Sequence, residues 1–310
     1  MGVLVPVKRD KGDEHMNKKI VLAGGTGFIG EYFQKQFKEL GYDVAIISRQ
    51  PGHISWSQKE AIIEALENAE ILLNLAGKSV NCRYNQNNKR EIMNSRTETT
   101  HVLGNAVQSC LRPPKLWINS STATIYRHAE DRPMTEREGE IGTGFSVDVA
   151  KAWEESFFSF RLPHTRQIAL RIAIVLGRHG GVVTPYKNLV AFGLGGPQGP
   201  GNQRFSWIHI HDLYRIILFL QEREELSGIF NCAAPEPVLN RELMSTLREA
   251  MNRPFGFPAP TWMLEMGAAF IQTETELLLK SRWVIPERLE EAGFHFEYPT
   301  LQAALEEILH

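Results

Sequence analysis

A glycine-rich turn between a short apolar run and a helix-like segment constrains the fold of this chain more than any other feature. The run 19–23 has the composition of a buried strand, and the phenylalanines after it recur at nearly helical spacing. Glycines at three-residue intervals allow a tight turn and close approach of a phosphate to the backbone, and the first helix amides face that anion. The pattern predicts a phosphate-binding loop at Gly24, Gly25, Thr26, Gly27, Phe28, Ile29 and Gly30. The alternative is a turn that binds nothing.

A second apolar run at residues 43–47 completes a strand–helix–strand unit, whose crossover favours parallel strands. At the end of the second strand, NAD-selective sites place a carboxylate that binds the adenosine ribose. This chain has Ser48-Arg49 there, and an arginine attracts the 2′-phosphate of NADP. We therefore expect NADP or NADPH as the cofactor, with NAD the weaker candidate. An ordinary solvated side chain is the other interpretation of Arg49.

The rest of the first half alternates strand-like and helix-like segments. Strands are expected at residues 70–75, 116–120 and 167–175, and helices at residues 60–68, 89–111 and 147–160. This alternation predicts an α/β fold with a Rossmann-type doubly wound parallel sheet. We assign residues 16–177 to this NADP-binding domain.

The sequence pattern changes after Gly177. Residues 193–201 are rich in glycine and proline, and residues 240–251, 262–281 and 286–292 are helix-like. We expect a small, mainly helical C-terminal substrate lobe over residues 178–310, with part of the chain between 200 and 235 returning to the Rossmann sheet. Residues 1–15 are polar and without pattern, and we interpret them as an expression-derived extension.

The composition argues against several classes of ligand. The formal net charge of −2 provides no broad positive surface for nucleic acid or an anionic membrane. Three cysteines without CxxC spacing indicate neither a disulfide framework nor a zinc site, and no apolar run approaches the roughly 20 residues of a membrane helix. We expect a cytoplasmic protein, monomeric or homodimeric, whose partner is a small-molecule substrate.

Three segments together resemble the nucleotide-sugar epimerase branch of the extended short-chain dehydrogenases/reductases. They are the glycine loop, the run Asn74-Leu75-Ala76-Gly77 and the run Ser120-Ser121-Thr122-Ala123-Thr124-Ile125-Tyr126. In that family the Asn-x-Ala-Gly segment lies beside the cofactor, so the resemblance implies cofactor contacts for Leu75, Ala76 and Gly77. For residues 73–76 alone, a buried strand end is the alternative.

Further motifs resemble an uncharacterised, epimerase-like subgroup of the NAD-dependent epimerase/dehydratase family that has a short C-terminal domain. These motifs lie at residues 171–177, 180–181, 206–212 and 283–286. The resemblance covers residues 18–309, and it implies the Rossmann fold that the strand and helix pattern predicts independently.

The resemblance implies a specific set of catalytic groups. Short-chain dehydrogenases use a tyrosine as general acid/base, a lysine that lowers its pKa, and a serine or threonine that binds the substrate oxygen. Thr122 matches the hydroxyl position. The alternative for Thr122 is a strand-end hydroxyl that is bonded to the backbone.

The tyrosine of the Tyr-x-x-x-Lys pair is missing from the helix at residues 147–160. Aligning the pair on Lys151 puts Val147 at the tyrosine position, whereas aligning on Glu154 puts Ser146 and Ala150 at the pair. Lys151 is the candidate for contact with the nicotinamide ribose, and a solvated helix lysine is the alternative.

Two arginines are candidates for binding the substrate. The resemblance places Arg83 in a basic and aromatic stretch that faces the cleft, and Arg204 near a diphosphate-binding arginine, with a register one residue longer. We expect no metal site at His209, His211 and Asp212, because further ligands are not spaced nearby; Asp212 is expected to cap the next helix.

Two functions fit these features. One is an NADP-dependent oxidoreductase or epimerase that acts on a hydroxylated, nucleotide-linked or otherwise anionic substrate. The other is a non-catalytic NADP(H)-sensing or regulatory protein, which a complete phosphate loop beside an incomplete acid/base pair would suit.

Overall fold

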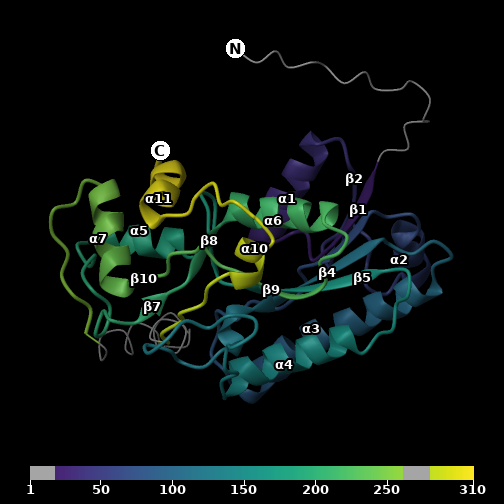
Figure 1. Cartoon of the computed structure of the whole chain (residues 1–310), viewed down its shortest axis with the longest axis horizontal. Coiled ribbons are helices and arrows are strands. Elements are labelled where there is room, and N and C mark those ends of the chain that lie inside the picture. Colours follow the sequence, from purple (N-terminus) through teal and green to yellow (C-terminus); the bar gives the residue numbers. More distant parts are fainter. Residues whose placement is uncertain (1–17, 261–279) are drawn as a thin grey trace, which may run out of the picture.

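A six-stranded parallel sheet forms the centre of the computed structural model, which describes residues 18–260 and 280–310 (Figure 1). The strand order is β2-β1-β3-β4-β5-β9, so the chain starts one strand from the edge, adds β2 as the edge strand and then crosses back to add β3, β4, β5 and β9 on the other side of β1. The strands are β1 (Lys19–Ala23), β2 (Asp43–Ile47), β3 (Ile71–Asn74), β4 (Leu116–Thr122), β5 (Arg166–Ile172) and β9 (Gly228–Cys232).

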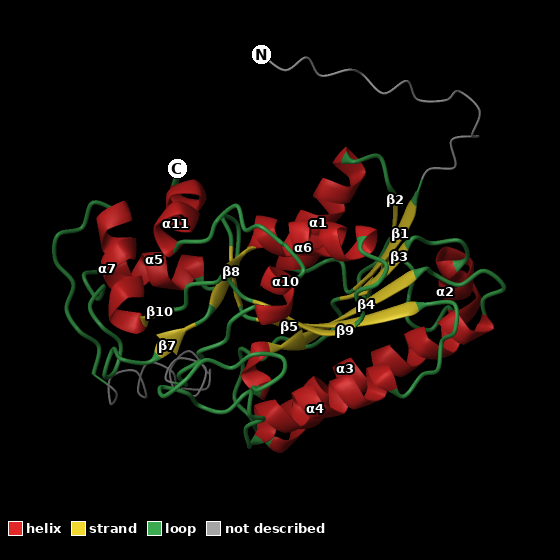
Figure 2. Cartoon of the chain, in the orientation of Figure 1, coloured by secondary structure: helices red, strands yellow, loops and turns green. Residues whose placement is uncertain are grey.

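Helices cover both faces of this sheet, because its strands are apolar on both sides. On one face, Phe33 and Phe37 of α1 pack with Tyr214 and Ile217 of α6 against β1. On the other face, α2, α3 and α4 pack on the alternate residues of the same strands (Figure 2). The helices are α1 (Phe28–Glu39), α6 (Ile210–Glu222) and α10 (Glu287–Glu291) above the sheet as drawn, and α2 (Lys59–Leu66), α3 (Gln86–Ser109) and α4 (Phe145–Phe158) on the opposite face.

A smaller lobe lies beyond the carboxyl ends of the strands, on the left of Figure 1. It has its own apolar core, in which Tyr186, Trp207, Leu247 and Leu305 are buried. Its helices are α5 (Val183–Ala191), α7 (Asn240–Ala250) and α11 (Leu301–Leu309), and two small sheets pair β6 (Ile174–Leu176) with β8 (Trp207–His209) and β7 (Arg204–Phe205) with β10 (Val238–Leu239).

The predicted Rossmann-type fold is confirmed, with one strand corrected. Residues 167–175 do not form a single strand: β5 ends at Ile172, and the chain bends at Ala173 so that β6 pairs with β8 in the lobe. A continuous apolar run cannot reveal that change of partner. The helix expected at residues 262–281 and the extension at residues 1–15 fall almost entirely outside the described residues. Within residues 18–260 and 280–310, no helix combines the length and apolarity needed to cross a bilayer.

Asp212 anchors the C-terminal segment instead of capping a helix. Helix α6 begins at Ile210, and its cap is His209, whose Nδ1 accepts the His211 N–H at 3.3 Å. Asp212 is fully buried in the first turn, and its two oxygens accept the backbone N–H groups of residues 297 and 298, both at 2.9 Å. Arg215 donates to the same carboxylate at 2.9 Å. The expectation that Asp212 is the cap was therefore wrong, because a tertiary contact uses this carboxylate.

A buried polar network joins β4, α4, β5 and β9. Arg171 donates to both oxygens of Glu154, at 2.9 and 2.8 Å, and Ser121 donates to the same carboxylate at 2.6 Å. Arg171 also donates to the phenol oxygen of Tyr126, which in turn donates to Asn231. Burial alone would lower the pKa of Arg171, but the hydrogen bond and the charge of Glu154 raise it above its usual value.

Candidate cofactor and substrate site

The glycine loop has the geometry of a ligand cradle. Gly24 has φ +77°, and a Cβ there would lie 2.7 Å from Cα of Ala76. A Cβ on Gly30 would lie 2.5 Å from the carbonyl carbon of Gly25, so the start of α1 can only reach this position without a side chain. At Gly27, in contrast, a Cβ would meet nothing within 4 Å. The loop is thus closed where it packs on the protein and open where the helix begins, as binding of a pyrophosphate requires.

Phe28 and Ile29 form the first turn of α1. The Phe28 ring packs on a glycine surface, since a Cβ on Gly180 would lie 2.6 Å from its Cδ2 and one on Gly177 would lie 2.9 Å from its Cζ. Ile29 packs against the core above the sheet. Both side chains therefore hold the helix N-terminus in place, while the amides of the first turn, which have no partners within the helix, point out of its end.

The end of β2 carries the groups expected for the 2′-phosphate. Ser48 is buried, and its Oγ accepts the Gln50 N–H at 2.9 Å and lies 3.3 Å from Oγ1 of Thr26. Arg49 is exposed, and within the described parts of the chain no side chain pairs with it. Two hydroxyls and a free guanidinium thus lie at one edge of the glycine loop, and such groups bind a phosphate monoester.

The segment after β3 forms the next wall. Asn74 is buried, donates to Asn119 at 2.7 Å and accepts the Ala76 N–H at 3.0 Å. Leu75 donates its N–H to the carbonyl of residue 23 at 2.8 Å. Gly77 lies against a guanidinium, because a Cβ on it would come within 3.0 Å of Cζ of Arg96. The chain from the glycine loop to Arg96 is therefore in continuous contact through Ala76 and Gly77.

A cavity of about 120 Å³ opens at the carboxyl end of β4. Its polar side chains are four hydroxyls, from Tyr84, Thr122, Thr124 and Ser146, together with the guanidinium of Arg96. Its apolar wall comes from Val80, Ile92, Phe145, Val149 and Trp153. Because Arg96 contacts Gly77, this cavity adjoins the segment that the family resemblance places beside the cofactor.

Two of these hydroxyls can still bind a ligand. The Thr122 oxygen accepts the Thr124 N–H at 3.1 Å, which leaves its own hydrogen to donate. The Ser146 oxygen is buried and has no hydrogen-bond partner in the part of the chain that the structure describes. Because an unpaired buried hydroxyl is costly, this one indicates that a polar ligand atom fits next to it.

The structure shows which face of α4 lines the cavity. Ser146, Val149 and Trp153 lie on one side of the helix and line the cavity. Lys151 is exposed and does not line it, because five residues of helix rotate it about 140° away from Ser146. The alignment with Ser146 at the tyrosine position is the one that faces the cavity. The spacing of Ser146, Val149 and Trp153 is the sequence signal that places them on one face of a helix.

The two candidate substrate arginines lie in different places. Arg83 is half-buried in the loop before α3, next to Tyr84, and does not itself line the cavity. Arg204 lies in β7 of the lobe, with its guanidinium 4.3 Å from the centre of the Trp283 ring. It lines a separate, water-sized cavity of about 10 Å³. Arg204 and Thr122 thus line different cavities.

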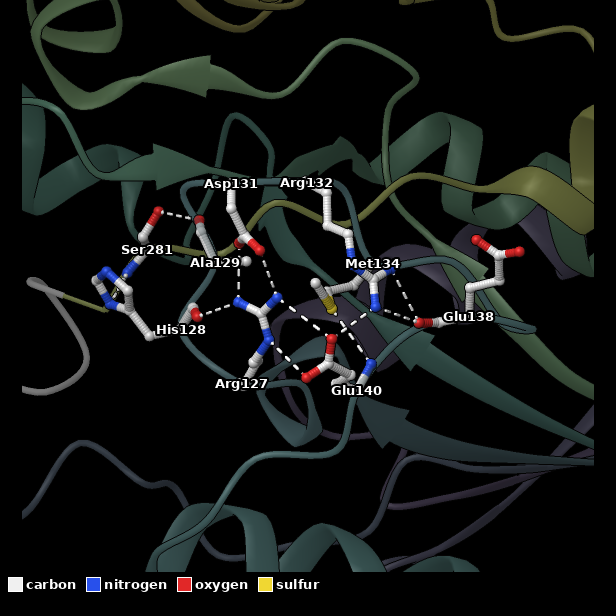
Figure 3. A network of polar contacts seen from close by, with 9 residues as sticks. All are labelled: Arg127, His128, Ala129, Asp131, Arg132, Met134, Glu138, Glu140 and Ser281. Carbon is white, nitrogen blue, oxygen red and sulfur yellow. Dashed lines mark hydrogen bonds and ion pairs between the residues drawn. The ribbon is translucent and has the colours of Figure 1, made fainter.

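A surface network orders the loop that leads into α4 (Figure 3). Arg127 pairs with both oxygens of Asp131, at 2.9 and 2.8 Å, and with Glu140 at 3.0 Å. Ser281 donates to the carbonyl of Ala129 at 2.7 Å, which joins the loop to the lobe. This network holds residues 127–140, the stretch of chain that precedes α4. Across the residues that the structure describes, no three His, Cys, Asp or Glu side chains are placed to hold a metal ion.

The fold and these contacts define an α/β protein with a dinucleotide cradle and an adjoining polar cavity. Comparison with known proteins is specific: the model of the NAD dependent epimerase/dehydratase family matches residues 20–233, and a domain of unknown function, DUF1731, matches residues 259–308. This chain belongs to the NAD-dependent epimerase/dehydratase family, which confirms the resemblance.

Relatives and solved structures extend the match over most of the chain. The human epimerase family protein SDR39U1 is 33% identical over 298 residues, which are 94% of this chain and 99% of that protein. The crystal structure of human SDR39U1 (isoform 2) with NADPH has a TM-score of 0.84 at 32% identity and covers 94% of this chain and 98% of that one. A nucleoside-diphosphate sugar epimerase from Corynebacterium glutamicum has a TM-score of 0.74 at 26% identity, covering 94% of this chain and 58% of its own.

Proposed function

We propose that this protein is an NADP-dependent oxidoreductase or epimerase-like enzyme that acts on a small hydroxylated or carbonyl substrate. One observation carries the proposal: the glycine loop, which is open at Gly27, is connected through Ala76 and Gly77 to a cavity lined by four hydroxyls and the guanidinium of Arg96. The relative SDR39U1, whose structure contains NADPH, supports the cofactor. Gly24, Gly27 and Gly30 would hold the pyrophosphate, Ser48 and Arg49 the 2′-phosphate.

Each polar residue of the cavity has its own role in the proposed reaction. Bound NADPH supplies a hydride for a carbonyl carbon. Thr122 and Ser146 donate hydrogen bonds to the substrate oxygen and hold it at the cofactor side of the cavity. Tyr84 is the phenol of this cavity, and it donates the proton that the oxygen takes up as the carbonyl becomes a hydroxyl. It replaces the tyrosine that α4 lacks. Screening small carbonyl compounds and sugar nucleotides for NADPH oxidation tests this activity.

Gly27→Ala is expected to separate ligand binding from folding. The backbone of Gly27, with φ −99° and ψ 175°, suits alanine, and the added methyl meets no protein atom. The free energy of unfolding should therefore change by less than about 1 kcal/mol, while NADPH binding weakens at least about tenfold, because the methyl occupies the space of the pyrophosphate. Thermal unfolding without ligand and fluorescence titration with NADPH measure the two effects. Unchanged NADPH affinity in this variant would contradict the proposed cradle.

Arg49→Ala is expected to remove the preference for NADPH. Loss of a charge-assisted phosphate contact should weaken NADPH by about 10- to 100-fold and leave NADH nearly unchanged. Parallel titrations of the wild type and the variant with both cofactors give the ratio, and Arg90→Ala, an exposed arginine on α3, is the control. Equal loss of both cofactors would show that Arg49 does not bind the 2′-phosphate.

The second candidate is a non-catalytic NADP(H)-binding protein. The observation that favours it is the serine at the tyrosine position of α4, which cannot act as the family's usual acid/base. This alternative is supported if NADPH binds tightly and no compound in the screen is turned over.

A further inference from the structure

Arg96 is a half-buried cation that has no carboxylate partner among the residues that the structure describes. Burial lowers its pKa to about 10, an effect that only the Tyr84 phenol opposes. In the described residues no Asp or Glu forms an ion pair with it, whereas Arg171, which is buried, is paired with Glu154. Removing a guanidinium from water without a counterion costs free energy. The position of Arg96 therefore requires an explanation.

The contacts of Arg96 orient it without neutralising it. Its Nη1 donates to the carbonyls of Lys78 and Ile92, at 3.1 and 3.0 Å. The guanidinium also lies 5.1 Å from the centre of the Trp153 ring. These neutral partners fix the side chain against the cavity wall, and its Nη2 makes no hydrogen bond to any part of the chain that the structure describes. A guanidinium has five N–H donors, so donors remain for a ligand.

The other cavity residues define what kind of anion fits. The cavity of about 120 Å³ is several times larger than the space that one water needs, so it admits a small organic compound. Thr122 and Ser146 can donate to a second, neutral oxygen of that compound. We infer that Arg96 binds the carboxylate of a small hydroxy- or oxo-acid, whose adjacent oxygen is held by Thr122 and Ser146. This inference rests on the proposed function and names its substrate class.

Pyruvate and its neutral counterpart pyruvamide test the charge requirement directly. In the wild-type full chain with saturating NADP⁺, pyruvate should bind about tenfold more tightly than pyruvamide, as a charge-assisted contact predicts. 2-Oxobutyrate and 2-oxobutanamide give a second matched pair. Calorimetric titration measures all four. Equal affinities within each pair, or no binding of either acid, would overturn the inference even if no variant folds.

Arg96→Gln assigns the effect to one residue. In this variant the preference for pyruvate over pyruvamide should fall to about one, while NADP⁺ affinity stays unchanged. Arg90→Gln, on the exposed side of the same helix, should behave as the wild type. Retention of the pyruvate preference in Arg96→Gln would refute the assignment. Repeating the titrations without NADP⁺ separates the two proposals: failure of NADP⁺ to bind, with Arg96-dependent pyruvate binding intact, overturns only the proposed cofactor function.

Discussion

Replacing Glu154 by glutamine is expected to lower the free energy of unfolding by about 3–5 kcal/mol. The substitution keeps the shape of the side chain but removes its charge, so the buried guanidinium of Arg171 loses its counterion. Ser121 also loses an anionic acceptor at 2.6 Å. Chemical denaturation of both proteins at neutral pH gives the difference directly.

Two comparison variants sharpen this test. Glu155→Gln changes the neighbouring, exposed carboxylate on the same helix and should shift stability by less than about 0.5 kcal/mol. The double variant Glu154→Leu with Arg171→Met removes both charges and should be more stable than Glu154→Gln, because two apolar groups leave no unpaired ion. If Glu154→Gln were as stable as Glu155→Gln, the buried pair would have no role in stability.

Asp212→Asn is expected to loosen the C-terminal segment and to destabilise the protein by about 3 kcal/mol. The carboxylate accepts two backbone N–H groups, and an amide presents its own N–H to one of them. Hydrogen exchange should therefore accelerate at the amides of residues 297 and 298 more than at those of the central sheet.

Asp148→Asn is the matched control for this variant, since Asp148 is exposed in the first turn of α4. It should leave exchange at residues 297 and 298 unchanged. Wild-type exchange at these amides in Asp212→Asn would mean that the carboxylate does not hold the segment.

Local sequence patterns predicted the Rossmann part of the fold because its determinants are local. The glycine loop and the helical spacing of Phe33 and Phe37 each act over a few residues. The break at Ala173 and the use of Asp212 could not be predicted in this way, because each depends on a partner far along the chain. An aspartate before an apolar helix looks like a cap whether or not a distant segment donates to it.

The candidate site likewise has a part that local sequence predicts and a part that depends on distant contacts. The cradle residues follow from a contiguous motif, whereas the cavity joins Tyr84, Thr122 and Ser146 from three separate elements. Sequence alone left the alignment of α4 open between Lys151 and Glu154. Only the packing of the helix shows that Ser146 faces the cavity, and only the folded structure shows that Arg96 lines this cavity without a carboxylate partner among the described residues.

The order of elements along the chain has a consequence for how this architecture can be rearranged. After β5 the chain builds β6, α5, β7 and β8 in the lobe, returns for α6 and β9, leaves again for β10 and α7, and comes back with α10 before ending in α11. A truncation after residue 177 would remove the sixth strand and the helix that covers α1. The lobe is therefore not a detachable module, and a chimaera that exchanges substrate lobes between relatives would have to exchange three separate stretches of chain.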